Sequence, residues 1–481
     1  MSCYVRCCAV LTLWFLSQSF TLAIAADAVP RPRNVLFLIA DDLNCDLHCY
    51  GHSQVRSPNI DALATRGVRF ERAYCQYPLC SPSRTSLLTG RRPNRTRVLT
   101  NARTFIRGVE NTGSPHFREF IPDTVTLPQL FRNHKYFSAR VGKLYHYAVP
   151  AEMGTNGLDD DASWDFVVNP AGRDKAEENK VFSLIPGSYG GTLSWLASQG
   201  SDAEQTDGLI ATAAISLLEE HQHEPFFLAV GFFRPHTPYV SPENYFEHYP
   251  LSGIDLPALS PADVNREPPA AYKSANRVQD KMSDELRRQA IQAYWASIEF
   301  MDAQVGRVVA ALDRLGLAEN TVIVMTSDHG YHMYEHGLWQ KRSLFENSAR
   351  VPLIICAPGA AANGTSTAAL VELVDLYPTL AEACGLPAPD YLDGVSQWPV
   401  LQKTKSHVRE HALTQVRHGK IDGYSLRTPR YRYSLWDSGK SGQQLYDMEA
   451  DPEETHNLAD EPQHAELIHK LRTTIEQEAA R

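Results

Sequence analysis

The sequence predicts an α/β fold built on one large, mostly parallel sheet that is covered by helices. Four segments are continuously apolar, as expected for strands buried on both faces of a sheet: residues 34–40, 226–232, 321–326 and 351–356. Segments with helical spacing of apolar residues alternate with them, which is typical of parallel sheets with crossover helices. The length of 481 residues is sufficient for one large α/β domain and a smaller one.

The first 25 residues predict a signal peptide. Arg6 precedes an apolar stretch over residues 9–25, and the stretch ends in the small-residue pattern Ala23-Ile24-Ala25. A membrane anchor is the alternative, because a bilayer span needs about 20 apolar residues. Polar residues dilute the end of the stretch and favour cleavage. We expect an exported protein, periplasmic or secreted (lysosomal-like in a eukaryote), with no stable membrane insertion after cleavage.

Helices are predicted at residues 59–66, 203–220 and 283–315, between the predicted strands. Residues 150–203 are rich in Gly, Asp and Ser, and residues 242–272 are rich in Pro, so both are expected to be long loops that shape a substrate pocket.

The pattern changes beyond residue 385. Residues 423–428 and 431–436 alternate as a β-hairpin does, and a polar helix is predicted over residues 462–480. We predict a main domain over residues 31–399 and a small antiparallel α+β subdomain over residues 400–481.

Composition excludes several classes of protein. Hydrophobic residues make up 43% of the chain and charged residues 21%, which excludes a disordered chain, collagen and a coiled coil. The formal net charge of −10 argues against a nucleic-acid binder that relies on bulk charge. Local basic sites for an anionic substrate are compatible with this balance.

Acidic residues follow two of the predicted strands. Asp41 and Asp42 come directly after the first apolar run, and Asp328 with His329 follows the run at residues 321–326. Ligands bind beyond the carboxyl ends of the strands in open α/β sheets. Adjacent carboxylates repel each other unless a cation lies between them, so three aspartates indicate a hard divalent cation, Ca²⁺ or Mg²⁺. Helix capping or turn formation by the aspartates is the alternative.

The most specific motif is Cys80 to Gly90, which reads C-S-P-S-R-T-S-L-L-T-G. Pro82 suits the first turn of a helix and Gly90 suits its exit. Cys80 would then lie at the positive end of the helix, where thiolates and anions are favoured. Arg84, four residues later, would lie on the same face, close to an anion bound there. A lone cysteine that is buried and inert is the alternative.

This motif resembles the signature of the sulfatase family, in which the cysteine of C-x-P-x-R is oxidised to Cα-formylglycine. Nearly the whole chain follows the family's order of motifs. The matching segments are residues 35–43, 58–64, 80–90, 142–146, 233–238, 326–330 and 445–454. Within the family the chain is most similar to the iduronate 2-sulfatase group, through residues 34–43, 56–61, 89–93 and 423–428. His329 follows the third metal aspartate as in that group, whereas many sulfatases have Asn there. Residues 331–334 depart from the group.

The resemblance implies an alkaline-phosphatase-like fold: a large mixed, mostly parallel sheet sandwiched by helices, with a small C-terminal antiparallel sheet. It also implies one Ca²⁺ ion, which would polarise the sulfate group. The implied metal ligands are Asp41, Asp42, Cys80, Asp328 and His329. The implied catalytic residues are Cys80, Arg84, Lys143, His146, His236 and Lys341.

In the implied reaction, one hydroxyl of the hydrated formylglycine attacks sulfur, and a proton taken from the other hydroxyl then allows sulfate to leave. Lys143 and Lys341 would neutralise the sulfate charge, and Arg84 would orient the formylglycine hydroxyls. His146 and His236 are candidates for proton transfer. Lysines are usually solvated surface residues, so each assignment has an ordinary alternative.

We therefore expect a sulfuric ester hydrolase that acts on a sulfated sugar, in particular a 2-O-sulfated uronic acid. Arg234 or the pair Lys341-Arg342 could bind its carboxylate. The expected partners are the sulfated carbohydrate and a formylglycine-generating or equivalent maturation enzyme, with no nucleic acid. The alternatives are a phosphodiesterase or phosphonate hydrolase of the alkaline-phosphatase superfamily and a non-catalytic binder of sulfated glycans. A zinc site at His329, His332 and His336 is a further alternative.

Overall fold

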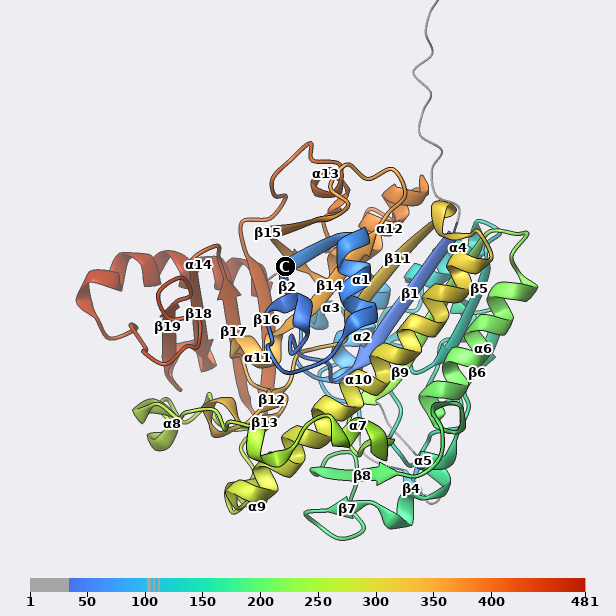
Figure 1. Ribbon diagram of the computed structural model, residues 1–481. Coiled ribbons are helices and arrows are strands. Elements are labelled where there is room, and N and C mark those ends of the chain that lie inside the picture. The colour runs from blue at the N-terminus through green and yellow to red at the C-terminus, as the bar shows by residue number, and fades with distance from the viewer. Residues whose placement is uncertain (1–33, 102–104, 107–108, 111–112, 481) are drawn as a thin grey trace, which may run out of the picture. The chain divides into compact units, whose positions relative to one another are not determined.

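An eight-stranded sheet lies at the centre of the computed structural model, with the strand order β15-β2-β14-β11-β1-β9-β5-β6 (Figure 1). Its strands are β1 (Asn34–Asp41), β2 (Val68–Tyr74), β5 (Phe137–Gly142), β6 (Phe166–Val168), β9 (Phe226–Pro235), β11 (Thr321–Ser327), β14 (Arg350–Cys356) and β15 (Thr365–Glu372). The structure describes residues 34–101, 105–106, 109–110 and 113–480, so the predicted signal peptide lies outside the described residues. None of the helices found in this part of the chain has the length and apolar character needed to cross a bilayer.

The sheet is mixed, and one strand accounts for the mixture. β14 pairs antiparallel with both β11 and β2, whereas the other neighbouring strands of the sheet pair in parallel. The four predicted apolar runs are β1, β9, β11 and β14. The prediction of an α/β fold with a mostly parallel sheet is therefore confirmed.

Helices cover both faces of the sheet, and the alternation of β1 shows why. Leu36 and Leu38 pack in the apolar cluster that includes α1 (Pro58–Arg66), α6 (Thr206–Glu220) and α10 (Asp284–Arg314). Val35 and Phe37 pack on the opposite face with α2 (Cys80–Thr89), α4 (Leu127–Asn133) and α12 (Leu376–Cys384). Successive side chains of a strand point to opposite faces, so a strand buried on both sides must be apolar throughout.

The three predicted helices are α1, α6 and α10. Ser283 caps α10, because its hydroxyl accepts a hydrogen bond from the Leu286 amide at 3.3 Å. A 3₁₀ turn over residues 202–204 precedes α6, so that helix begins three residues later than its sequence pattern indicates.

The long connections carry short elements rather than loops alone. They form a three-stranded sheet of order β10-β8-β7 and two hairpins. These strands are β3 (Phe105–Ile106), β4 (Val109–Glu110), β7 (Phe182–Ser183), β8 (Ser194–Ser198), β10 (Tyr239–Pro242), β12 (His332–Met333) and β13 (Trp339–Gln340). The short helices are α3 (Pro93–Thr96), α5 (Arg173–Ala176), α7 (Glu243–Glu247), α8 (Pro261–Asn265), α9 (Arg277–Asp280), α11 (Glu346–Ala349) and α13 (Trp398–Leu401).

A four-stranded antiparallel sheet and a helix form the C-terminal part of the fold. They comprise β16 (Ala412–His418), β17 (Ile421–Arg427), β18 (Tyr431–Trp436), β19 (Gln443–Asp447) and α14 (Ala465–Ala480). The predicted hairpin is β17–β18, and its apolar side chains pack with Leu471 and Ile475 of α14 in a cluster of their own. The domain boundary between residues 399 and 400 stays a prediction.

Candidate active site

The acidic residues meet because two strands end at the same level. β1 and β11 are adjacent and parallel, with Ala40 opposite Ser327, so the residues that follow each strand lie side by side. Asp41 is the last residue of β1, and Asp328 comes directly after β11. The Asp42 amide donates a hydrogen bond to the Asp328 carboxylate at 3.1 Å. The predicted position beyond the carboxyl ends of the strands is therefore the observed one.

Helix α2 brings the cysteine to the same place. Cys80 is the first residue of α2, after the extended residue Leu79, and Gly90 ends the helix in the left-handed conformation at a φ of 65°. A Cβ at Gly90 would lie 2.7 Å from a methyl carbon of Leu392, so glycine is required there on steric grounds as well. The thiol thus lies at the positive end of the helix dipole.

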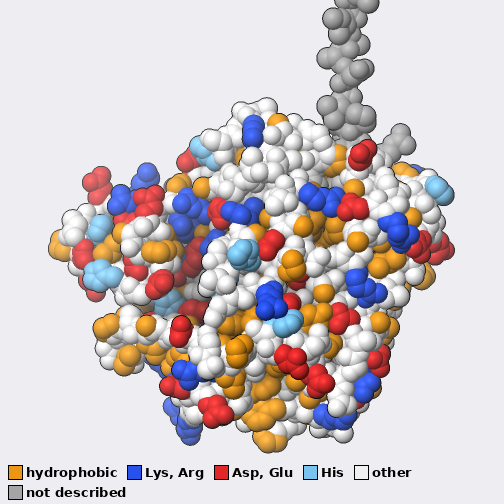
Figure 2. Space-filling view, viewed as in Figure 1, with side chains coloured by type: hydrophobic (Ala, Val, Ile, Leu, Met, Phe, Trp, Pro, Cys, Tyr) orange, Lys and Arg blue, Asp and Glu red, His pale blue; other side chains and the backbone are white. Residues whose placement is uncertain are grey.

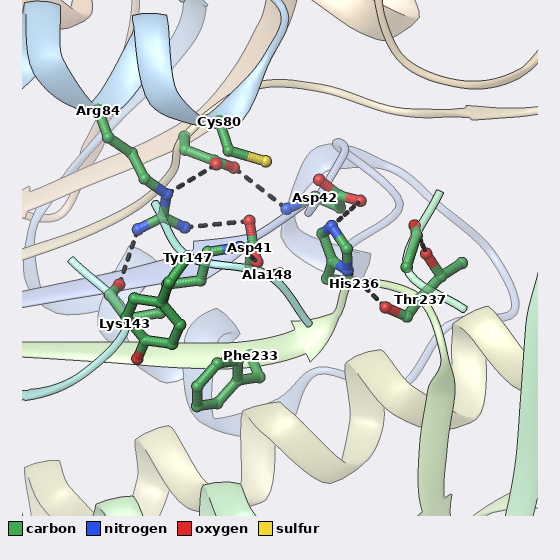
Figure 3. Close-up of polar contacts among 12 residues, drawn as sticks. Asp41, Asp42, Cys80, Arg84, Lys143, Tyr147, Ala148, Phe233, His236 and Thr237 are labelled. Atoms are coloured by element: carbon green, nitrogen blue, oxygen red, sulfur yellow. Dashed lines mark hydrogen bonds and ion pairs between the residues drawn. The ribbon is translucent and has the colours of Figure 1, made fainter. Parts of the chain in front are cut away.

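Arg84 lies one turn along α2, and its buried guanidinium lies beside the aspartates (Figure 3). Its Nε donates to Asp328 Oδ2 at 2.9 Å and its Nη2 to Asp41 Oδ1 at 3.2 Å. Its Nη1 donates to the backbone carbonyl oxygens of Lys143 and Leu144 at 2.7 and 3.1 Å. Arg84 therefore cross-links the ends of three strands, and its planar fork suits this role.

Two lysines extend toward the aspartates. Lys143 follows β5, and its Nζ lies 2.5 Å from Asp41 Oδ2. Lys341 follows β13, and its Nζ lies 2.5 Å from Asp42 Oδ1 and 3.1 Å from Cys80 Sγ. Although burial acts in the opposite direction, Lys143 holds the pKa of Asp41 below its usual value.

The environment of Cys80 favours a thiolate. His329 Nδ1 faces the Gly330 carbonyl oxygen at 2.9 Å, which leaves Nε2 at 3.5 Å from Cys80 Sγ. Burial disfavours the charged thiolate, but Lys341 and Lys143 outweigh it and lower the pKa of Cys80 well below its usual value. A buried thiol without such neighbours has a raised pKa. The inert-cysteine alternative therefore does not fit this position.

Two more histidines border the thiol. His236 Nδ1 lies 2.5 Å from the Thr237 carbonyl oxygen, so its Nε2 points toward Asp42 Oδ2 at 3.7 Å (Figure 3). His146 is buried, and burial lowers its pKa to about 4. Its Nδ1 has no hydrogen-bond partner among the described residues. A neutral imidazole such as that of His146 is suited to accept a proton.

The acidic residues also fit a divalent cation. Two overlapping sets have ligand atoms within 4.8 Å of one another: Asp41, Asp42, Cys80 and His236, and Asp42, Cys80, Asp328 and His329. Asp42 belongs to both sets. Its Oδ2 atom is buried and has no hydrogen-bond partner among the described residues. Burial raises the pKa of Asp328 to about 6. Oxygen-rich ligands of this type are those that Ca²⁺ prefers.

The structure therefore brings together all of the predicted site residues. Arg234, in contrast, does not reach the site. It is buried, with its Nη2 2.5 Å from Asp174 Oδ2 and its other nitrogens bonded to the carbonyl oxygens of Val240, Pro238 and His236. It braces the turn that carries His236, so the expectation that it binds a substrate carboxylate is wrong.

The zinc alternative is not supported either. His332 Nε2 lies 2.7 Å from the Ser343 hydroxyl, and His336 Nδ1 lies 2.8 Å from Asp263 Oδ1. Neither histidine belongs to a metal-binding set with His329 among the described residues.

A cavity of about 860 Å³ borders the site. His146, His236 and Lys341 lie in its wall, together with residues that the sequence did not indicate. Asn101 is one of these, and its Oδ1 accepts a hydrogen bond from the Ser81 amide at 3.2 Å, which anchors the first turn of α2. The first predicted loop region and its border contribute further wall residues: Val149, Pro150, Ala151, Lys175, Glu178, Gly187, Ser188, Tyr189, Gly190 and Gly191. The second region contributes none, but Lys273, which directly follows it, lies in the wall. The Gly-rich composition of the first region is the sequence signal for this part of the wall.

The chain is similar to known proteins over nearly its whole length. A family model described as Sulfatase matches residues 33–386, and one described as N-sulphoglucosamine sulphohydrolase, C-terminal, matches residues 334–481. Iduronate 2-sulfatase of Mus musculus is 32% identical, over 96% of this chain and 98% of its own length. A sulfatase of Formosa agariphila is 32% identical, over 93% of this chain and 87% of its own length.

Two solved structures share the fold. A 2-O GAG sulfatase has a TM-score of 0.73 at 24% identity and covers 94% of this chain and 92% of its own. The phosphonate monoester hydrolase of Agrobacterium radiobacter has a TM-score of 0.74 at 23% identity and covers 94% of this chain and 96% of its own.

Proposed function

The chain belongs to the sulfatase family, and on that premise we propose that it removes the 2-O-sulfate from a uronic acid in a sulfated glycan. The observation that carries the chemistry is the Cys80 thiol at the start of α2, with Lys341 Nζ 3.1 Å away and three aspartates around it. The sugar is supported by the mouse relative, named iduronate 2-sulfatase, and by the solved structure described as a 2-O GAG sulfatase.

We propose that Cys80 is converted to formylglycine by a maturation enzyme. The hydrated aldehyde supplies a hydroxyl nucleophile on a carbon that can later release sulfate. The guanidinium of Arg84 is not free to follow this group, because five hydrogen bonds fix it in its buried position. It therefore holds Asp41 and Asp328 in place beneath the reacting group.

Asp41, Asp42, Asp328 and His329 would hold Ca²⁺ together with the modified side chain at position 80. The ion supplies positive charge that polarises the sulfate oxygens. Asp42 contributes the one carboxylate oxygen of the cluster that is buried without a hydrogen-bond partner among the described residues.

The remaining residues bind the anion and move protons. Lys143 and Lys341 place two ammonium groups beside the site, where they neutralise charge on the sulfate. His146 and His236 lie in the cavity wall. His236 can donate the proton that the departing sugar oxygen needs, whereas His146, whose pKa burial lowers to about 4, is suited to accept one. Every predicted catalytic position is filled, which argues against a non-catalytic glycan binder.

The substrate and the compartment follow from the same proposal. The substrate is a sulfated carbohydrate rather than a nucleic acid, and on the face seen in Figure 2 basic side chains alternate with acidic ones instead of forming a basic surface. A related solved structure is described in complex with D-glucosamine-2-N,6-O-disulfate, which supports a sugar substrate. We propose that residues 1–25 direct export to the periplasm or the outside of the cell, where the enzyme would encounter sulfated glycans.

Mass spectrometry of the peptide that contains Cys80 tests the modification. Conversion replaces sulfur with oxygen and removes two hydrogens, so the peptide is lighter and gains an aldehyde that reacts with hydrazides. Active enzyme with an unmodified thiol at position 80 contradicts the formylglycine mechanism. Cys80→Ala is the matched control, since it must lack both the mass change and the activity.

Hydrolysis rates on four esters test the substrate. We expect a 2-O-sulfated uronate disaccharide to be cleaved with a higher kcat/KM than a 6-O-sulfated glucosamine or an aryl sulfate. An aryl phosphonate monoester is the fourth ester, because the fold likeness to a phosphonate monoester hydrolase makes that activity the second candidate. A preference for the phosphonate ester would replace the proposed function with the second.

A further inference from the structure

Four basic side chains lie in the cavity wall, and they differ in their partners. Lys341 is bound to Asp42 and the Cys80 thiol, and Lys175 lies 2.6 Å from Glu178. Lys273 and Arg342 line the same cavity, and among the described residues neither makes an ion pair. Two positive charges in the wall are therefore left without a protein counter-charge.

The backbone at Arg342 is fixed while its guanidinium is available. Its amide donates to the Pro78 carbonyl oxygen at 3.1 Å, and its φ of 73° lies in the left-handed region. The side chain is exposed, and its one hydrogen bond to the described residues is a long one, 3.5 Å from Nη2 to the carbonyl oxygen of Arg417. A guanidinium has five N–H donors, so most of those of Arg342 have no acceptor among the described residues.

Lys273 is presented in a similar way from a different segment. The three residues before it, Ala270, Ala271 and Tyr272, are buried in an apolar cluster with Trp436 and Phe345. The Tyr272 hydroxyl also donates to the Asp263 carboxylate at 2.9 Å. The chain is therefore anchored up to Lys273, whose own side chain is exposed at the cavity.

The two cations belong to one part of the wall. His418, the last residue of β16, directly follows Arg417, whose carbonyl oxygen accepts the hydrogen bond from Arg342. Burial lowers its pKa to about 4, and the charges of Arg342 and Lys273 act in the same direction. The imidazole is therefore neutral at physiological pH and supplies no charge of its own. Two like charges that share one neighbourhood repel each other, and a bound anion relieves that repulsion.

We propose that Arg342 and Lys273 form a second anion subsite, which binds a carboxylate or sulfate group of the sugar substrate other than the sulfate that is removed. This inference rests on the proposed function. Lys341 points to the thiol and the next residue, Arg342, lies at the outer wall, so the two anion sites are adjacent along the chain. The second anion comes either from the uronate carboxylate on the same ring or from an acidic group on the neighbouring sugar.

Glutamine substitutions test the subsite, because they keep most of the side chain and remove the charge. The variants are Arg342→Gln, Lys273→Gln and the double variant, with Lys281→Gln as a control that removes an exposed charge from outside the cavity. On a 2-O-sulfated uronate substrate we expect KM to rise about ten- to a hundredfold in the single variants. On an aryl sulfate, which has no second anion, the loss should be at least tenfold smaller. Lys281→Gln should behave as wild type.

Two substrate forms identify the source of the anion. If methyl esterification of the uronate removes the difference between wild type and Arg342→Gln, the subsite binds the carboxylate of the same ring. If wild type and Arg342→Gln still differ on the methyl ester, but only when the oligosaccharide carries a second sulfate, the subsite binds an acidic group of the neighbouring sugar. Values within twofold of Lys281→Gln on every anionic substrate would overturn the subsite.

The proposed function can fail separately. If wild type cleaves aryl sulfate but no 2-O-sulfated uronate, the proposed substrate is wrong. The subsite is then measured by inhibition of aryl sulfate hydrolysis with heparan sulfate. An inhibition constant that rises at least tenfold in the double variant supports the subsite, and an unchanged constant refutes it.

Discussion

Replacement of Arg84 by methionine is expected to destabilise the protein strongly when metal is absent. Arg84 is 1% exposed, and its charge lies 2.9 Å from Asp328 and 3.2 Å from Asp41. At an effective dielectric constant of about 20, each pair is worth about 5 kcal/mol of attraction. Methionine fills most of the volume but leaves two buried carboxylates without this partner, and breaking a buried pair costs about 3–5 kcal/mol. We expect that loss in the free energy of unfolding.

Denaturant unfolding in the presence of a chelator measures the effect. Arg66→Met is the control, because Arg66 and Asp313 also form a 2.9 Å pair but their side chains are 38% and 45% exposed. An exposed pair contributes at most about 1 kcal/mol, so the control should remain within that of wild type. Saturating Ca²⁺ should reduce the deficit of Arg84→Met, because the cation compensates the carboxylates. If the free energy of unfolding of Arg84→Met with chelator is less than about 1 kcal/mol below that of wild type, Arg84 is not the required counter-charge of Asp41 and Asp328.

Three further results are expected. Lys341→Ala should lower kcat on aryl sulfate about 10²–10³-fold, as removal of one charged donor to a developing anion does, and steady-state kinetics would show it. A chelator should lower both activity and the melting temperature, added Ca²⁺ should restore them, and Asp42→Asn should abolish the Ca²⁺-dependent shift. Burial opposes ionisation of Glu346, but Arg432 and Arg427 lower its pKa from 4.5 to about 2. The stabilisation from the ionised Glu346 is complete above pH 4.5 and is lost as the pH falls toward 2. Glu346→Gln should therefore lower the free energy of unfolding at neutral pH by up to about 3 kcal/mol. Unfolding experiments below pH 4.5 should show a weaker dependence of that free energy on pH in the variant than in wild type.

The sequence predicts the floor of the site better than its walls. Asp41 and Asp42 follow a strand that must be apolar on both faces, and this alone indicates their position at the edge of the sheet. The proline and glycine of the Cys80 motif likewise indicate a helix that starts at the thiol. These signals lie within short stretches of sequence, so they can be recognised without knowledge of the tertiary structure.

Residues that reach the site from distant loops carry no such signal. Lys143, His146 and His236 were assigned through the family resemblance, and Asn101 and Lys273 were missed. Arg234 was misassigned, because its neighbours in sequence enter the site while its own side chain turns back into the fold. The direction of β14 was not readable either, since an apolar run looks the same in a parallel and an antiparallel strand.

The burial of Cys80 sets an order of events in the life of the protein. The Cys80 side chain is 0% exposed in the folded protein, so a second enzyme cannot bind it there. The conversion that we propose must then compete with folding, and it has to occur on the nascent or newly translocated chain. A molecule that folds first would keep its thiol permanently. Adding the maturation enzyme to purified, folded protein should accordingly fail to rescue activity, whereas co-expression should succeed.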